Sequence, residues 1–71
     1  MRTWLIKMRE KHNLSQQDVA NKLDITRQYY GLIENGERQK RMDITLAQKL
    51  ADIFGITIED IGRYEENSIR S

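Results

Sequence analysis

The chain has 71 residues, which is enough for one domain, and a chain of this length buries little apolar surface. It contains no cysteine, which excludes disulfides and thiolate zinc sites. Its net charge of +1 points to no partner by itself. No run approaches the roughly 18 apolar residues of a membrane span, and the first residues do not form a signal peptide, so a cytoplasmic location without membrane contact is expected.

The charges are divided unevenly along the chain. Residues 1–41 carry nine Lys or Arg side chains and five acids, whereas residues 42–71 carry three and six. The first part is therefore better suited to a polyanion than the second. Many surfaces that only face solvent show a similar asymmetry, so it is a weak indication.

Apolar spacing and capping residues predict five short helices. The expected helices span about residues 2–11, 16–23, 27–35, 44–54 and 58–65. The expected N-caps are Ser15, Thr26, Asp43 and Thr57. Residues 67–71 are expected to be a frayed tail, and residues 1–66 a compact all-α domain.

Residues 16–35 carry the most informative pattern. Two short helices are joined by about three residues, and the small Ala20 lies where the second helix must cross the first. Apolar side chains occupy the inner positions, namely Val19, Leu23, Ile25, Tyr30 and Ile33. The outer positions of the second helix hold Arg27, Gln28, Gly31 and Leu32. This spacing indicates a helix-turn-helix.

The segments 15–20, 25–27 and 33–36 resemble the helix-turn-helix of the lambda repressor and Cro type, the Xre family. Residues 50–57 resemble that family's fourth helix and the turn after it, so the resemblance covers about residues 5–61. It implies a five-helix lambda repressor-like domain that regulates transcription. The expected protein is a repressor that binds an inverted-repeat operator as a dimer, with helix 27–35 in the major groove of double-stranded DNA.

The sequence departs from the family pattern at three positions. Asp24 stands where the turn usually has Gly, and Asp tolerates the left-handed conformation better than most residues. A common proline after the basic loop is missing, with Met42 nearby. Tyr30 replaces a smaller aliphatic residue, and its hydroxyl is expected to reach water or a partner.

Three residues of helix 27–35 are candidates for base contact. Arg27 suits guanine and Gln28 suits adenine, each through two hydrogen bonds in the major groove. The alternatives are that Arg27 takes only a phosphate and that Gln28 faces solvent. Leu32 either touches a thymine methyl group or is buried in the core.

The resemblance also implies phosphate contacts. Gln16 is expected to contact a phosphate at a helix N-terminus and to brace the recognition helix. The full set of expected phosphate contacts is Gln16, Gln17, Thr26, Tyr29, Arg38, Lys40 and Arg41. The alternative for Gln16 is an exposed polar side chain, and the alternative for Arg38, Lys40 and Arg41 is a loop that only faces solvent. Tyr29 is expected to contact a phosphate or sugar and not a base. Arg9 and Glu34 are expected to form a structural ion pair.

Partners and chemistry complete the expectations. Leu46 and Ile53 are candidates for a homodimer contact, with a second surface at Ile61, Tyr64 and Ile69. An antitoxin or anti-repressor partner protein of the same fold is the alternative function. No enzyme, cofactor or metal site is expected, because the lone His12 has no Ser or Asp partner and no phosphate loop occurs.

Overall fold

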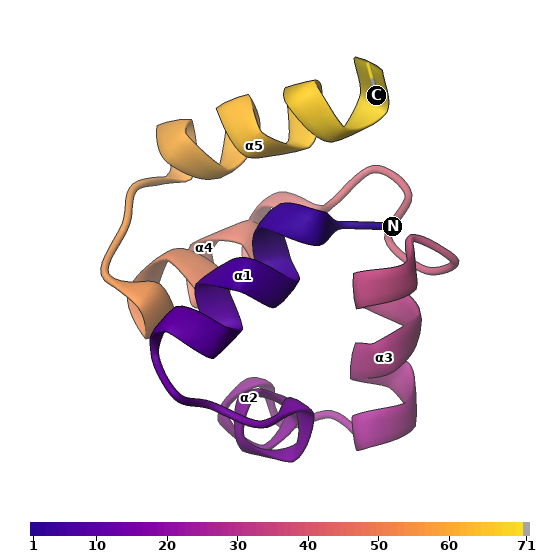
Figure 1. Cartoon of the computed structure of the whole chain (residues 1–71), viewed down its shortest axis with the longest axis vertical. Helices are drawn as coiled ribbons and strands as arrows, with labels where there is room; N and C mark the ends of the chain where they lie inside the picture. The colour runs from indigo at the N-terminus through magenta and orange to yellow at the C-terminus, as the bar shows by residue number, and fades with distance from the viewer. Residues whose placement is uncertain (71) are drawn as a thin grey trace.

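Five helices form the computed structural model, which describes the backbone of residues 1–70 and the side chains of residues 1–67 (Figure 1). The helices are α1 (Thr3–Lys11), α2 (Gln16–Leu23), α3 (Arg27–Asn35), α4 (Ile44–Phe54) and α5 (Ile58–Arg70). The described chain contains no strand, so the all-α class is confirmed. α1 and α4 lie in the centre, α5 covers one end, and α2 and α3 form the other end and one side.

The helix ends follow from the expected capping residues. Ser15 and Asp18 form a reciprocal capping box at the start of α2, in which each side chain accepts a hydrogen bond from the backbone N–H of the other. Thr57 and Asp60 make the same pair of bonds at the start of α5. Asn13 has the left-handed φ of 57° expected where the chain leaves α1.

The end of α5 differs from the expectation. The sequence predicts a helix that ends near Glu65, because Gly62 weakens the helix near its end. The helix instead continues to Arg70, and the expected fraying of the last residues stays a prediction. Ser71 lies outside the described residues. Tyr64 and Glu65, which follow Gly62, contact Trp4 and Arg2, and this packing stabilises the middle of the helix.

The core lies between all five helices. Val19, Ala20 and Leu23 of α2 pack with Tyr30 and Ile33 of α3, as the helix-turn-helix spacing predicts. The remaining buried apolar residues are Leu5, Ala47, Leu50, Ala51, Phe54 and Ile61. Complete burial of Ala20 allows α3 to cross α2 closely. The core therefore fixes the position of α3 from one side and leaves its other side exposed.

Both surfaces predicted for dimer contact are largely used within the chain. Leu46 and Ile53 are half-buried against the core. Ile61 is buried, and the ring of Tyr64 stacks on Trp4 of α1 with their centroids 5.3 Å apart. The side chain of the fifth candidate, Ile69, lies outside the described residues. Among the side chains that the structure describes, the large hydrophobic ones that are exposed are Met1 and Ile44.

Candidate nucleic-acid interface

The turn between α2 and α3 has a fixed shape. Asp24 adopts the left-handed conformation, with φ 59° and ψ 43°, as expected for the residue that replaces Gly. The next N–H, from Ile25, donates to the carbonyl of Ala20 at 3.0 Å. Thr26 then caps α3 by accepting the backbone N–H of Tyr29 at 3.1 Å. These bonds set the angle at which α3 leaves α2.

The outer side of α3 presents two unengaged polar side chains. Arg27 and Gln28 lie in its first turn and are exposed, and neither makes a side-chain hydrogen bond or ion pair with any described residue. Gly31 has open space where a Cβ would lie, so this side of the helix is narrow. Leu32 is half-buried, so it is neither fully in the core nor fully free to touch a thymine methyl group. A ligand can therefore approach the backbone of α3 closely here.

A buried carboxylate locks α3 against α1 and α2. Glu34 is 2 % exposed, and it accepts hydrogen bonds from Nε of Arg9 at 2.7 Å and from Nε2 of Gln16 at 2.9 Å. The structure thus brings together the expected pair of Arg9 and Glu34. Burial by itself would raise the pKa of Glu34, but the hydrogen bond and positive charge of Arg9, with a further hydrogen bond from Gln16, lower the pKa below its ordinary value.

Two α2 side chains that were expected to contact phosphates already make hydrogen bonds within the chain. The amide of Gln16 is engaged by Glu34, which gives it the bracing role, whereas its phosphate contact stays a prediction. Gln17 is exposed and donates to Oδ1 of Asn21 at 2.8 Å.

The Tyr30 hydroxyl was expected to reach water or a partner. It is instead buried beside Glu34, with no hydrogen bond of standard geometry to a described residue.

The loop from residue 36 to residue 43, here called the basic loop, follows α3 directly and lies beside its end (Figure 1). Arg38, Lys40 and Arg41 are exposed there. Gln39 has a left-handed φ of 55°, and its side chain connects α3 with the last residue of the loop. Its Nε2 donates to the hydroxyl of Tyr29 at 3.3 Å, and its Oε1 accepts the N–H of Asp43 at 3.1 Å. Tyr29, half-buried, therefore joins the loop to α3.

The sequence analysis missed the residue that holds this loop from inside. Arg2 was counted only among the basic residues, yet it is 4 % exposed. Its guanidinium donates to the carbonyls of Ile33, Arg38 and Gln39 and to the carboxylate of Glu65. Arg2 and Glu65 are 63 positions apart in the sequence, and no periodic pattern links them. Arg2 and Arg9 are therefore paired inside the fold and add little to the positive surface.

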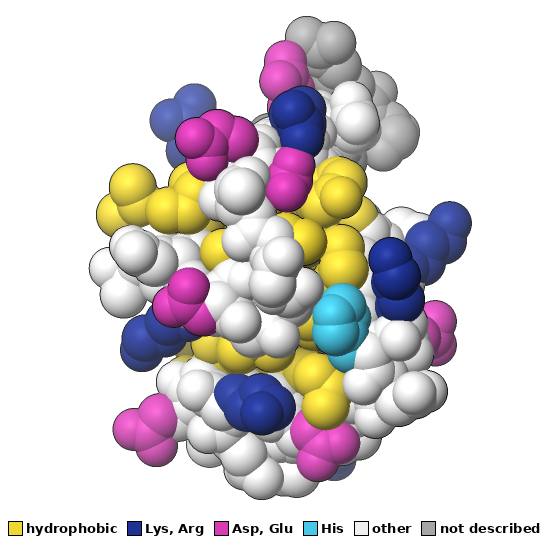
Figure 2. All heavy atoms as spheres, turned by 90° about the vertical axis from the view of Figure 1, so that its left-hand side faces the viewer, with side chains coloured by type: hydrophobic (Ala, Val, Ile, Leu, Met, Phe, Trp, Pro, Cys, Tyr) yellow, Lys and Arg dark blue, Asp and Glu magenta, His cyan; other side chains and the backbone are white. Residues whose placement is uncertain are grey.

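The face turned away from α3 carries charges of both signs. Figure 2 shows Lys and Arg side chains interspersed there with Asp and Glu, around an apolar band below α5. His12 lies on this face, with its ring 5.2 Å from that of Phe54. Within the described chain no three His, Asp or Glu side chains gather as a metal site, and no helix is long and apolar enough to cross a membrane.

Comparison with known proteins decides the family. Residues 5–61 match the family described as Helix-turn-helix. The chain belongs to this helix-turn-helix family. It is 44 % identical over 59 residues to a protein of Methanocaldococcus jannaschii named an uncharacterized HTH-type transcriptional regulator, covering 83 % of this chain and 86 % of that protein. No solved structure matches the chain.

Two further relatives are similar over most of their length. The HTH-type transcriptional regulator YqaF of Bacillus subtilis, also named uncharacterized, is 36 % identical over 63 residues, which is 86 % of this chain and 83 % of the relative. The control protein C.MunI of a Mycoplasma species is 36 % identical over 53 residues, which is 75 % and 69 % of the two chains. This helix-turn-helix protein is thus a DNA-binding transcriptional regulator by family.

The turn residue of this helix-turn-helix protein gives a first prediction. We expect Asp24→Asn to keep the stability, because Asn also tolerates the left-handed conformation. It should strengthen DNA binding roughly twofold, because it removes a negative charge worth about 0.4 kcal/mol against a phosphate about 10 Å away in water. Chemical denaturation and DNA titration of both proteins measure the two effects. Equal affinities of the two proteins would place Asp24 away from the phosphates, and weaker binding by the Asn variant would contradict the predicted repulsion.

Proposed function

We propose that this protein is a sequence-specific repressor that inserts α3 into the major groove of DNA. The observation that carries the proposal is the outer side of α3, where Arg27 and Gln28 are exposed without partners next to the open space at Gly31. The major groove of B-DNA is about 12 Å wide and admits an α-helix, whose exposed side chains can then reach the base edges. Arg27 would read guanine and Gln28 adenine, and Leu32 would touch a thymine methyl group where it is exposed.

The elements around α3 would supply the phosphate contacts. Thr26 and Gln17 lie at or near the N-termini of α3 and α2, where backbone N–H groups favour anions. At the other end of α3, the side chains of Arg38, Lys40 and Arg41 are exposed on the basic loop. Contacts at both ends of the helix would set its orientation in the groove without reading sequence.

A homodimer would extend the recognised sequence to two half-sites. One helix-turn-helix reads one half-site, and a two-fold pair reads an inverted repeat. Ile44, 70 % exposed at the start of α4, supports a contact between copies better than Leu46 or Ile53 does. We expect Ile44→Ser to shift the sedimentation equilibrium toward the monomer. An unchanged dimer would place the interface elsewhere.

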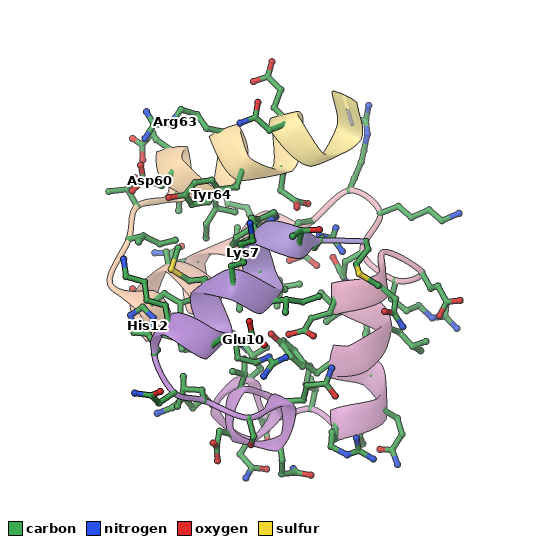
Figure 3. The ribbon with its side chains drawn as sticks, viewed as in Figure 1. Lys7, Glu10, His12, Asp60, Arg63 and Tyr64 are labelled. Atoms are coloured by element: carbon green, nitrogen blue, oxygen red, sulfur yellow. The ribbon has the colours of Figure 1, made fainter. Side chains whose placement is uncertain are left out.

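Titration of a labelled mixed-sequence duplex at several salt concentrations tests the proposed DNA contact. Lys40→Ala should weaken binding to all sequences alike and lower the magnitude of the salt slope by about 1 for each chain, as one phosphate contact is lost. Lys7→Ala is the matched control, because Lys7 is an exposed residue of α1, apart from α3 (Figure 3). Equal slopes for the two variants would contradict the role of Lys40.

If the protein has no measurable affinity for DNA, the repressor proposal is replaced by its alternative. The fold would then serve chiefly to bind a protein, as in the antitoxin alternative. Co-purification of a second small protein from the native source, together with absent salt-dependent duplex binding, is the result that would replace the repressor proposal. Salt-dependent binding of the purified protein to the duplex, without a second protein, supports the DNA-binding proposal.

A further inference from the structure

The guanidinium of Arg2 joins α5 to the end of α3. Its Nε lies 2.9 and 3.0 Å from the two carboxylate oxygens of Glu65, and its Nη2 lies 2.9 Å from Oε1. Its Nη1 donates to the carbonyl of Ile33 at 2.6 Å. The backbone N–H of Arg2 donates to the carbonyl of Glu34 at 2.7 Å. Arg2 is therefore attached to α3 by two hydrogen bonds, one from its side chain and one from its backbone.

The same guanidinium also holds the basic loop. Nη1 donates to the carbonyl of Arg38 at 3.2 Å, and Nη2 donates to the carbonyl of Gln39. These carbonyls belong to residues next to or among the three exposed cations of the loop. The inner side of the loop backbone is thus bound to Arg2, while the side chains of Arg38, Lys40 and Arg41 are left exposed to solvent.

Glu65 is itself fixed by a second donor. Nε1 of Trp4 donates to Oε2 of Glu65 at 2.9 Å, and the Trp4 ring stacks on Tyr64. The carboxylate is therefore held from two sides, and it receives all of its bonds from α1 and the residue before it. Because Arg2 and Glu65 are both largely buried, water competes little for these bonds.

We propose that Arg2, held by Glu65, is a positioning residue for DNA binding, which keeps the basic loop in the conformation that meets the phosphates. The inference rests on the proposed DNA contact of this loop. A loop ordered before binding loses less conformational entropy when it binds. Without Arg2 the loop would sample other conformations, and fewer of its cations would reach phosphates at once.

Glu65→Gln separates positioning from simple electrostatics. The substitution raises the net charge by one, so charge alone would strengthen DNA binding. The new amide NH2 group, however, is a donor that faces the donors of Arg2 or Trp4, and one bond of the network is lost. The positioning role predicts weaker binding and a smaller salt slope, so the change in affinity is opposite to the one that charge alone would cause.

Arg2→Met has a matched control on α5, the helix of Glu65. Arg63 pairs with Asp60 on α5, but Arg63 is exposed and the pair lies away from the basic loop, near the start of α5 (Figure 3). Arg63→Met removes the same charge from the same kind of pair. Arg2→Met should therefore lower the salt slope clearly more than Arg63→Met does, by about 1–3 through lost phosphate contacts.

The experiment measures anisotropy of a labelled mixed-sequence duplex of about 30 base pairs over a salt series, with each variant shown to be folded by circular dichroism. The expected result is a smaller slope for Glu65→Gln and Arg2→Met than for the wild type and for Arg63→Met. Wild-type slopes in folded Glu65→Gln would overturn the positioning role, even if Arg2→Met does not fold. Absent binding by the wild type would instead overturn the proposed function.

Discussion

Glu34→Gln should lower the free energy of unfolding by about 3–5 kcal/mol, because it removes the charge that neutralises a largely buried Arg9. The new amide group would also place a donor beside the donors of Arg9 and Gln16. A domain of this size is expected to have a total stability of roughly 4–10 kcal/mol. The loss is therefore a large share of the total, and the midpoint of urea unfolding should fall strongly.

Glu10→Gln is the matched control for this prediction. It removes the same charge from α1, but Glu10 is exposed (Figure 3). A surface substitution of this kind changes stability by less than about 0.5 kcal/mol. Similar unfolding midpoints for the two variants would show that the buried pair does not hold α1 to α3.

The same pair predicts the acid sensitivity of the fold. The pKa of Glu34 in the folded chain is lower than its ordinary value of 4.5, so the ionised carboxylate stabilises the fold fully above that pH. The contribution is lost as the pH falls through the lowered pKa. Wild-type stability should therefore decrease below about pH 4.5 more steeply than that of Glu34→Gln. Parallel pH profiles would contradict the lowered pKa.

Gln28→Ala should remove the preference for one base pair in the operator and leave the fold intact. Gln28 is exposed and makes no bond within the described chain, so its removal exposes no buried partner. A bidentate contact to a base discriminates by about 1–3 kcal/mol, which is roughly 5-fold to 150-fold in relative affinity. Arg27→Ala should do the same at a neighbouring position.

Competition binding with operator variants measures this discrimination. Each protein is titrated with duplexes that differ at one base pair, and circular dichroism shows that the variants are folded. Lys40→Ala is the comparison, because it should weaken binding to every duplex by the same factor. If Gln28→Ala and Arg27→Ala keep the wild-type base preference, recognition lies outside the first turn of α3.

Local signals made much of this fold predictable from the sequence. Ser15, Thr26 and Asp43 act as N-caps where they were expected, and the left-handed Asp24 fits the short turn. Helical periodicity also identified Val19, Tyr30 and Ile33 as inward residues. These features depend on neighbours within about one or two helical turns, which a linear pattern records directly.

Long-range polar contacts could not be predicted in the same way. Arg2 and Glu65 meet only because α5 packs across α1, and neither residue stands in a recognisable motif. The continuation of α5 past Gly62 is likewise accompanied by long-range contacts, those of Tyr64 and Glu65 with α1 and Arg2. The exposure of Ile44 in place of Leu46 depends on how α4 rotates against its neighbours, which periodicity fixes only roughly.

Selection of bound sequences from a random duplex library, at near-physiological salt, tests the central claim most directly. Repressor function through α3 predicts an enriched inverted repeat whose half-sites lie about one helical turn apart. Repeating the selection with Gln28→Ala should relax one position in each half-site. No enrichment, with only weak and salt-sensitive binding, would contradict sequence-specific recognition by this protein.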